Sequence, residues 1–446
     1  MSELRDADVV VIGLGTSGLA AVRVAAVRGA RVRVTEERPR AEVEQAAREA
    51  EAARAEVLAG GHRPEHLDAA DLVVVSPGVP ERAPVLRWAR QRRIPVWSEL
   101  ELGARLAEAP YVGVTGTNGK TTTTEMIAAA MRAGGLDAVA CGNIGHPFSV
   151  AATEGHQALV VEASSFQLRF HRTFHPRVSV LLNLAPDHLD WHGTLDRYRD
   201  AKARIFELQG AEDVHVGNRD DPHAAALSRR AHCPVRWFTL ADPRPGEAGF
   251  RDGALALGPG RTFGGPASST DAHRADAAAA LAAAVAFGVD ADAAASAIVA
   301  FPPLAHRGAV VAEVGGVRFV DDSKATNPHA ALAALSSLDR AVLVAGGRSK
   351  GLDLSPLAAA IPRLAGVVAL GEAAPELERL FAGRVPVRRV GSIEEAVVEA
   401  HRMASPGETV LLAPACASQD MFRDYRERGE RFASAARRLQ EVDTHA

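Results

Sequence analysis

The chain has 446 residues, and a typical domain size of about 150 residues predicts roughly three domains. Its 51 basic and 55 acidic residues give a net charge of −4, which provides no electrostatic basis for binding nucleic acid or a membrane surface. Because there are only three cysteines and the longest apolar run is too short to span a bilayer, we expect a cytoplasmic protein without disulfides or membrane insertion.

Short valine-rich runs alternate with amphipathic segments, a pattern typical of βα units in parallel sheets. The first predicted strands lie at 9–12, 32–35 and 72–76, and a second series lies at 111–114, 158–162 and 178–182. A stretch rich in Gly, Pro and Ser over 241–270 predicts short strands or loops, and Ala-rich helices are predicted over 273–300. A third series of strands is predicted at 317–320, 341–345, 367–370 and 409–412.

The first glycine-rich turn is Gly13-Leu14-Gly15-Thr16-Ser17-Gly18, between a predicted strand and a helix. Its glycines allow close approach of a pyrophosphate, which the N–H groups of the helix N-terminus can bind. Glu36 stands at the end of the next strand, where an acidic residue would hold a ribose hydroxyl, and Ser76 and Gly78 lie at the same sheet edge. These residues leave three interpretations open: a nicotinamide or flavin dinucleotide, another nucleotide, or tight packing alone.

The second glycine-rich turn is Thr115-Gly116-Thr117-Asn118-Gly119-Lys120-Thr121-Thr122. Its backbone N–H groups can cradle phosphates, Lys120 can neutralise them, and the Thr121 hydroxyl can coordinate Mg²⁺. An ordinary strand-to-helix turn would not require Lys and Thr directly after the glycine. We predict ATP rather than GTP, because no Asn-Lys-x-Asp motif for reading guanine follows.

This second turn resembles the ATP loop of the Mur ligases and of the related folylpolyglutamate synthases, which join an amine to a carboxylate at the expense of ATP. Three later residues follow in the order found in Mur ligases: Glu162 at a strand end, His188 in Pro186-Asp187-His188, and Lys202 on a helix. Taken singly, Glu162 is consistent with a loop cap and His188 with a turn residue, and a lone lysine such as Lys202 would usually be a solvent-exposed helix charge.

The resemblance implies a catalytic centre with two Mg²⁺ ions. Thr121 and Glu162 would hold the ion at the ATP phosphates. Glu162, His188 and Lys202 would hold the second, with Lys202 carbamylated, because an ammonium group cannot ligate a cation. The implied catalytic set is Lys120, Glu162, His188, Lys202 and Lys324.

The resemblance also assigns ligand contacts in the last part of the chain. Arg307 and Lys324 would approach the ATP phosphates and Asp322 the ribose, while Asn143 would lie near both ATP and the sugar nucleotide. Cys416 has no base placed beside it, and we interpret it as a packing residue. The segment His273-Arg274-Ala275-Asp276-Ala277 departs from the family's Asn-rich pattern, so no adenine contacts are carried over to it.

Two motifs favour the D-glutamate-adding branch of the family: Glu162-Ala163-Ser164-Ser165-Phe166-Gln167-Leu168 and Pro414-Ala415-Cys416-Ala417-Ser418. The glutamate would contact His188, Thr326, Lys350, Ser418, Gln419 and Tyr425. The first glycine-rich turn would then bind a UDP-sugar rather than a redox cofactor, through Gly15, Thr16, Ser17, Glu36, Ser76, Gly78, Asn143, Ser164 and Gln167.

The resemblance therefore implies a bacterial, monomeric ligase that adds D-glutamate to UDP-N-acetylmuramoyl-L-alanine through an acyl phosphate, in peptidoglycan precursor synthesis. We predict three α/β domains: a Rossmann-like, UDP-binding domain over 1–99, a central P-loop-type mononucleotide-binding ATPase domain over 100–303, and a Rossmann-like C-terminal domain over 304–446 that binds the incoming amino acid. The alternatives are another Mur-type or folylpolyglutamate-synthase-like ligase, a nicotinamide-dependent protein that hydrolyses ATP, and a nucleotide-gated binding module.

Overall fold

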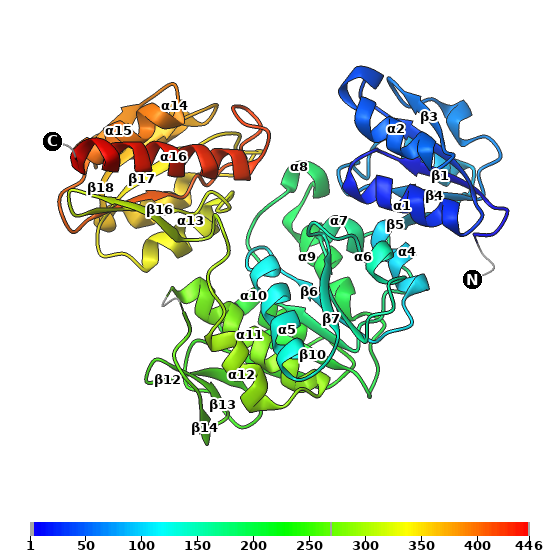
Figure 1. Ribbon diagram of the computed structural model, residues 1–446, viewed down its shortest axis with the longest axis horizontal. Coiled ribbons are helices and arrows are strands. Elements are labelled where there is room, and N and C mark those ends of the chain that lie inside the picture. Colours follow the sequence, from blue (N-terminus) through cyan, green and yellow to red (C-terminus); the bar gives the residue numbers. More distant parts are fainter. Residues whose placement is uncertain (1–3, 268–269, 445–446) are drawn as a thin grey trace. The chain divides into compact units, whose positions relative to one another are not determined.

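The computed structural model describes residues 4–267 and 270–444, which form three β-sheets flanked by helices. In Figure 1 these sheets lie in the blue, the cyan-to-green and the yellow-to-red parts of the chain. The described residues divide into two compact units: the first contains the first two sheets, and the second contains the third sheet together with the loop Ala185–Asp190. The predicted α/β class with three parts is confirmed, whereas the exact domain boundaries remain a prediction.

The first sheet has five parallel strands in the order β3-β2-β1-β4-β5. Its strands are β1 (Asp8–Ile12), β2 (Arg31–Glu36), β3 (Glu56–Ala59), β4 (Leu72–Val75) and β5 (Val96–Ser98), and its helices are α1 (Thr16–Val27), α2 (Glu44–Ala52) and α3 (Pro84–Gln91). The continuous valine runs of β1 and β4 are buried because helices cover both faces of a parallel sheet. Helix α4 (Glu99–Leu106) follows β5 directly.

The second sheet has nine strands in the order β14-β13-β12-β11-β10-β9-β6-β8-β7. They are β6 (Tyr111–Thr115), β7 (Ala138–Gly142), β8 (Ala158–Glu162), β9 (Val178–Leu181), β10 (Val214–Asn218), β11 (Val235–Phe238), β12 (Ala248–Arg251), β13 (Ala254–Leu257) and β14 (Arg261–Thr262). Strands β6 to β12 pair in parallel, and β13 and β14 extend the sheet antiparallel. The short strands predicted over 241–270 are thus confirmed as β12–β14, apart from residues 268–269, which lie outside the described residues.

Helices of very different length surround this second sheet. They are α5 (Lys120–Ala133), α6 (Phe148–Ala151), α7 (Ser165–Leu168), α8 (Leu189–His192), α9 (Leu195–Ala203), α10 (Pro222–Ser228), α11 (Asp271–Phe287) and α12 (Ala291–Val299). The alanines of α11 from Ala277 to Ala284 are fully or almost fully buried, together with Met126 and Met131 of α5, in one hydrophobic core. The small alanine side chain lets the helices approach closely, and its burial costs no side-chain entropy.

The third sheet has six strands in the order β15-β16-β20-β17-β18-β19. They are β15 (Ala309–Val314), β16 (Val317–Asp321), β17 (Ala341–Gly346), β18 (Leu364–Leu370), β19 (Val387–Arg389) and β20 (Thr409–Leu412); only β15 runs antiparallel to its neighbour. The helices are α13 (Pro328–Ser336), α14 (Ala374–Phe381), α15 (Ile393–Met403) and α16 (Tyr425–Thr444).

Cys141, Cys233 and Cys416 are all buried and free. Burial raises the pKa of the Cys416 thiol to about 12, which agrees with its interpretation as a packing residue. Within residues 4–267 and 270–444, no helix combines the length and the apolar character needed to cross a membrane.

Candidate active site

The second glycine-rich turn connects β6 to α5 and is held by the loop after β9. Asn183 is the principal partner: its Oδ1 accepts from the Asn118 N–H at 2.8 Å, and its Nδ2 donates to the Asn118 carbonyl at 3.1 Å. The Thr117 N–H also donates to the Asn183 carbonyl. Gly119 precedes the helix with a φ of +85°, in the left-handed region that favours glycine. The loop conformation therefore depends both on hydrogen bonds with Asn183 and on the glycine in its own sequence.

The predicted phosphate-binding side chains lie on this turn and the first residues of α5. Lys120 Nζ donates to the carbonyls of Gly116 and Thr117 at 3.0 and 2.9 Å, so the ammonium lies over the loop. Thr122 is buried in the first turn of α5, whereas the Thr121 hydroxyl reaches the neighbouring strand end. The arrangement leaves a cation and a helix N-terminus at one place, which suits a polyphosphate.

Glu162, Thr121 and Asn143 come together at the carboxyl ends of β8 and β7. Thr121 Oγ1 donates to Glu162 Oε2 at 2.6 Å, and Asn143 Nδ2 donates to Glu162 Oε1 at 3.1 Å. Glu162 is only 3% exposed, and hydroxyl and carboxylate oxygens are the ligands that Mg²⁺ prefers. The residues present thus fit the first predicted cation, although the described part of the chain holds no cluster of three or more His, Cys, Asp or Glu side chains with metal-binding geometry.

Lys202 of α9 is almost fully buried, at 2% exposure. Its Nζ donates to the Gly116 carbonyl at 2.6 Å and lies 4.7 Å from the ring centre of Tyr198, whose hydroxyl bonds Thr117 Oγ1 at 3.0 Å. The interpretation of Lys202 as a solvent-exposed helix charge is therefore wrong. The structure places the ammonium group of this lysine in contact with the phosphate loop.

His188 lies in the loop Ala185–Asp190, which belongs to the second unit, whereas Glu162 and Lys202 belong to the first. The preceding residue, Asp187, is the centre of a buried polar cluster. Its carboxylate accepts from Lys350 Nζ at 2.9 Å and from Asn327 Nδ2 at 3.1 Å. Burial alone would raise the pKa of Asp187, but His188 and Lys350 outweigh it and lower that pKa. Lys350, predicted to meet the glutamate carboxylate, is thus paired with a carboxylate of the protein.

The remaining predicted residues of the second unit gather around the ends of β16 and β20. Lys324 Nζ lies 4.0 Å from the ring centre of Tyr425. Burial raises the pKa of Asp322 to about 7, and the charge of Arg307 opposes that rise. Ser418 is buried, Thr326 is half-buried and Gln419 is exposed.

The buried Arg428 connects the loops that carry these predicted residues of the second unit. It is 1% exposed, and its guanidinium donates to Ser323 Oγ, to the Ser323 carbonyl and to the Cys416 carbonyl. The loops that carry Lys324 and Ser418 are therefore joined through one side chain.

The first glycine-rich turn is joined to Glu36 at the end of β2. Glu36 Oε2 accepts from the Leu14 N–H at 2.7 Å, and Arg38 donates to both carboxylate oxygens. Burial would raise the pKa of Glu36, but these hydrogen bonds lower it to about 2. Ser76 Oγ donates to the Gly13 carbonyl at 3.0 Å.

The other predicted UDP-sugar residues fall into two groups. Gly15, Thr16 and Gly78 are exposed and Ser17 is half-buried, so the N-terminus of α1 is accessible to a ligand. Ser164 and Gln167 are buried and bond each other as the capping box of α7.

Sequence reasoning missed three side chains that shape the phosphate loop: Asn183, Tyr198 and Asp276. Asp276, at the start of α11, accepts from Thr123 Oγ1 at 3.2 Å and lies beside Gly119. Asn183 and Tyr198 stand within the motifs that carry His188 and Lys202, and this proximity was the available signal. No local signal connects Asp276 with a loop some 150 residues earlier in the chain.

Comparison with known proteins agrees with this geometry. Three family models match: the Mur ligase MurD-like N-terminal domain over residues 7–98, the Mur ligase middle domain over 114–247, and the Mur ligase glutamate ligase domain over 306–416. Among solved structures, the MurF ligase of Thermotoga maritima in complex with ADP superposes with a TM-score of 0.63 at 16% identity, covering 99% of each chain. That likeness concerns the fold.

The chain belongs to the Mur ligase family and is an ATP-dependent acid–amino-acid ligase, as predicted. Two relatives are UDP-N-acetylmuramoylalanine–D-glutamate ligases. The protein from Frankia casuarinae is 46% identical, over 96% of this chain and 93% of the relative, and the protein from Geobacter metallireducens is 40% identical over 98% of both chains. Both relatives belong to the D-glutamate-adding branch, which is the branch predicted from the sequence.

Proposed function

We propose that this protein joins D-glutamate to UDP-N-acetylmuramoyl-L-alanine at the expense of ATP, in peptidoglycan precursor synthesis. The observation that carries the proposal is the match to D-glutamate-adding ligases over nearly the whole chain, together with a lysine-containing phosphate loop next to Glu162. A carboxylate resists attack by an amine because it is negatively charged. Transfer of the γ-phosphoryl group to the L-alanyl carboxylate gives an acyl phosphate, from which the glutamate amine displaces inorganic phosphate.

The residues of the phosphate loop act on the triphosphate. The Lys120 ammonium and the N–H groups at the start of α5 bind the β- and γ-phosphates, and Asn183, which accepts the Thr117 and Asn118 N–H groups, keeps the loop in place for them. Arg307 and Lys324 supply further positive charge to the transferring group. Two anions react in this step, so the cations lower the barrier by offsetting charge repulsion.

Thr121 and Glu162 would hold one Mg²⁺, and Glu162, His188 and a carbamylated Lys202 would hold a second. Bound there, the ions would neutralise phosphate charge and bring the carboxylate close to the γ-phosphate. The burial of Lys202 on the Gly116 carbonyl supports a role at the phosphates rather than in solvent. The carbamate is tested by depleting CO₂ and by Lys202→Ala with added short carboxylates. The carbamate would be excluded if CO₂ depletion left the activity unchanged and no short carboxylate restored activity to Lys202→Ala.

The same proposal places the two other substrates. The sugar nucleotide binds at the α1 N-terminus and Glu36, and the D-glutamate carboxylates bind near Lys350, Thr326 and Ser418. Because Lys350 is paired with Asp187 in this structure, glutamate must share or replace that carboxylate contact.

The testing experiment is phosphate release with UDP-N-acetylmuramoyl-L-alanine, ATP and Mg²⁺. Turnover should require D-glutamate, and L-glutamate, L-lysine and diaminopimelate should each fail to replace it. Lys120→Ala should abolish turnover, and a near-normal rate would exclude its role. Turnover with L-lysine but not D-glutamate would overturn the substrate while leaving the chemistry intact. We also propose that the protein acts as a monomer, which light scattering of the working enzyme tests.

A further inference from the structure

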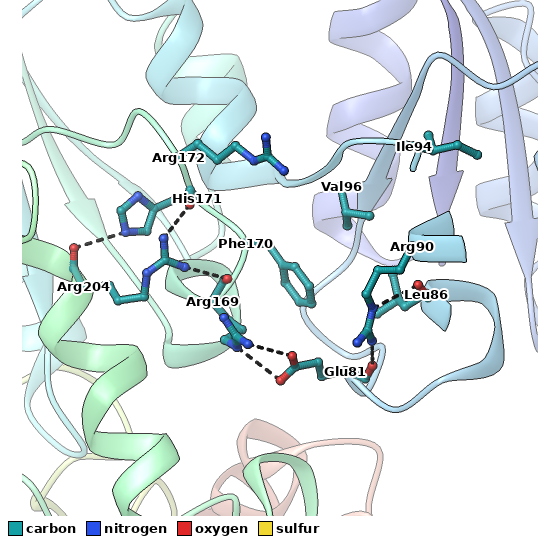
Figure 2. A pocket seen from close by; sticks show the side chains of 10 residues that line it. All are labelled: Glu81, Leu86, Arg90, Ile94, Val96, Arg169, Phe170, His171, Arg172 and Arg204. Atoms are coloured by element: carbon teal, nitrogen blue, oxygen red, sulfur yellow. Dashed lines mark hydrogen bonds and ion pairs between the residues drawn. The ribbon is translucent and has the colours of Figure 1, made fainter. Parts of the chain in front are cut away.

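A cavity of about 340 Å³ lies in the first unit, and none of the residues that line it is among those predicted to bind nucleotide, metal or amino acid. Figure 2 shows that α3 and β5 supply one wall and that the segment Arg169–Arg172 and Arg204 supply the other. We call it the arginine cavity, because Arg90, Arg169, Arg172 and Arg204 line it together with a single carboxylate, Glu81.

Two of the four arginines are committed to the fold. Arg204 donates to the carbonyls of Leu168, Arg169 and His171 and also pairs with Glu207, so it fixes the segment that forms the wall. Arg169 forms a two-point ion pair with Glu81, at 2.9 and 3.2 Å. The carboxylates of Glu81 and Glu207 are therefore already paired with Arg169 and Arg204.

The other two guanidinium groups keep their charge uncompensated. Among the residues that the structure describes, Arg90 donates only to the carbonyls of Leu86 and Glu81, which are not anions. Within residues 4–267 and 270–444, the Arg172 guanidinium has no hydrogen-bond or ion-pair partner. The backbone of Arg172 is nevertheless held, because its N–H donates to the buried Glu101 at 2.7 Å. The cavity thus presents two positive charges on anchored segments.

Apolar side chains form part of the lining between these charges. Phe170 stands in the middle of the side chains in Figure 2, with Val96 and Ile94 on the opposite wall. Guanidinium groups bind phosphate in a two-point geometry, and an aromatic face beside them suits a flat group. The volume lies within the range of small-molecule pockets.

We propose that the arginine cavity binds a small organic phosphate, a phosphate monoester that carries a flat apolar group. The dianion lies between Arg90 and Arg172, and the apolar group lies against Phe170. This site is additional to the nucleotide sites of the proposed ligase reaction.

Phenyl phosphate is the probe, titrated by calorimetry into the full-length protein at low salt, with and without saturating Mg–ADP and UDP. Arg172→Gln and Arg90→Gln should each weaken binding about tenfold or more, because each removes a charged hydrogen-bonding partner. The matched control is Arg87→Gln, an exposed arginine on the same helix that does not line the cavity, and its affinity should stay within twofold of wild type. Ligase turnover without the probe should be unchanged in all three variants.

Several results would overturn the proposal. These are absence of saturable binding, equal affinities for wild type and Arg172→Gln, and displacement of phenyl phosphate by ADP or UDP, which would place it in the nucleotide sites. Inorganic phosphate that binds as tightly as phenyl phosphate would refute the apolar contact. None of these results bears on D-glutamate-dependent turnover, so the two proposals fail separately.

Discussion

Gly119 combines a positive φ with a close neighbour, so a side chain at this position of the phosphate loop would be strained. Its φ of +85° costs an alanine about 1 kcal/mol, and a Cβ added there would lie 2.1 Å from Asp276 Oδ1. Asp276 is 7% exposed and accepts a hydrogen bond from Thr123, so moving it costs roughly 1–2 kcal/mol more. Gly119→Ala should therefore destabilise the binding conformation of the loop by about 2–3 kcal/mol, which corresponds to roughly 30- to 150-fold in kcat/KM for ATP.

The assay is ADP release at saturating D-glutamate and UDP-N-acetylmuramoyl-L-alanine, with ATP varied. Gly135→Ala is the matched control, because Gly135 lies just beyond the other end of α5 with a φ of +87° and no neighbour within 4 Å of a Cβ. It should lower stability by about 1 kcal/mol and leave kcat/KM for ATP unchanged. A Gly119→Ala enzyme with wild-type kcat/KM, or an equal loss in Gly135→Ala, would refute the steric argument.

Three further changes test the supporting structure. Asp187→Asn should lower the free energy of unfolding of the second unit by about 2–3 kcal/mol, because it leaves the mostly buried Lys350 ammonium without its ion partner. Denaturant titrations measure this change, and an unchanged free energy would show that the ion pair does not contribute to stability. Burial lowers the pKa of His215 to about 3, so this residue alone should make stability fall by up to about 1.4 kcal/mol per pH unit as the pH drops below 6.5, where only the unfolded chain takes up its proton. His171 and His192, whose pKa values burial lowers to about 4, add to the slope. His215→Gln should therefore reduce the slope of unfolding curves measured between pH 4 and 7 by about the share of His215, and an unchanged slope would contradict that assignment. Arg428→Lys should cost about 2–4 kcal/mol in thermal or chemical unfolding, since an ammonium cannot make the three bonds to Ser323 and the Cys416 carbonyl at once, and a stability equal to wild type would refute this.

The sequence is most informative where one signal is both local and strong. The valine runs of β1 and β4 predict buried parallel strands, and the turn from Gly116 to Thr121 predicts a phosphate loop, because in each case the chemistry lies in consecutive residues. Strands β3 and β5 were not identified: β5 has three residues, and the residues of β3 are at most half-buried, so neither has a marked apolar pattern.

The supporting contacts depend on long-range packing and could not be predicted in the same way. Asp276 reaches Gly119 only because the alanine helix α11 packs against α5. Asp187 meets Lys350 across more than 160 residues of sequence, and nothing near either residue specifies that pair. The arginine cavity likewise combines segments far apart in the chain, each of which has an ordinary surface composition.

The central claim is that the carboxylate of UDP-N-acetylmuramoyl-L-alanine is phosphorylated before the amine attacks. It is tested most directly with substrate labelled with oxygen-18 in that carboxylate, by mass spectrometry of the phosphate released during turnover with D-glutamate. Transfer of the γ-phosphoryl group to the carboxylate predicts one labelled oxygen in each phosphate. Unlabelled phosphate from an enzyme that is forming the amide would contradict the account.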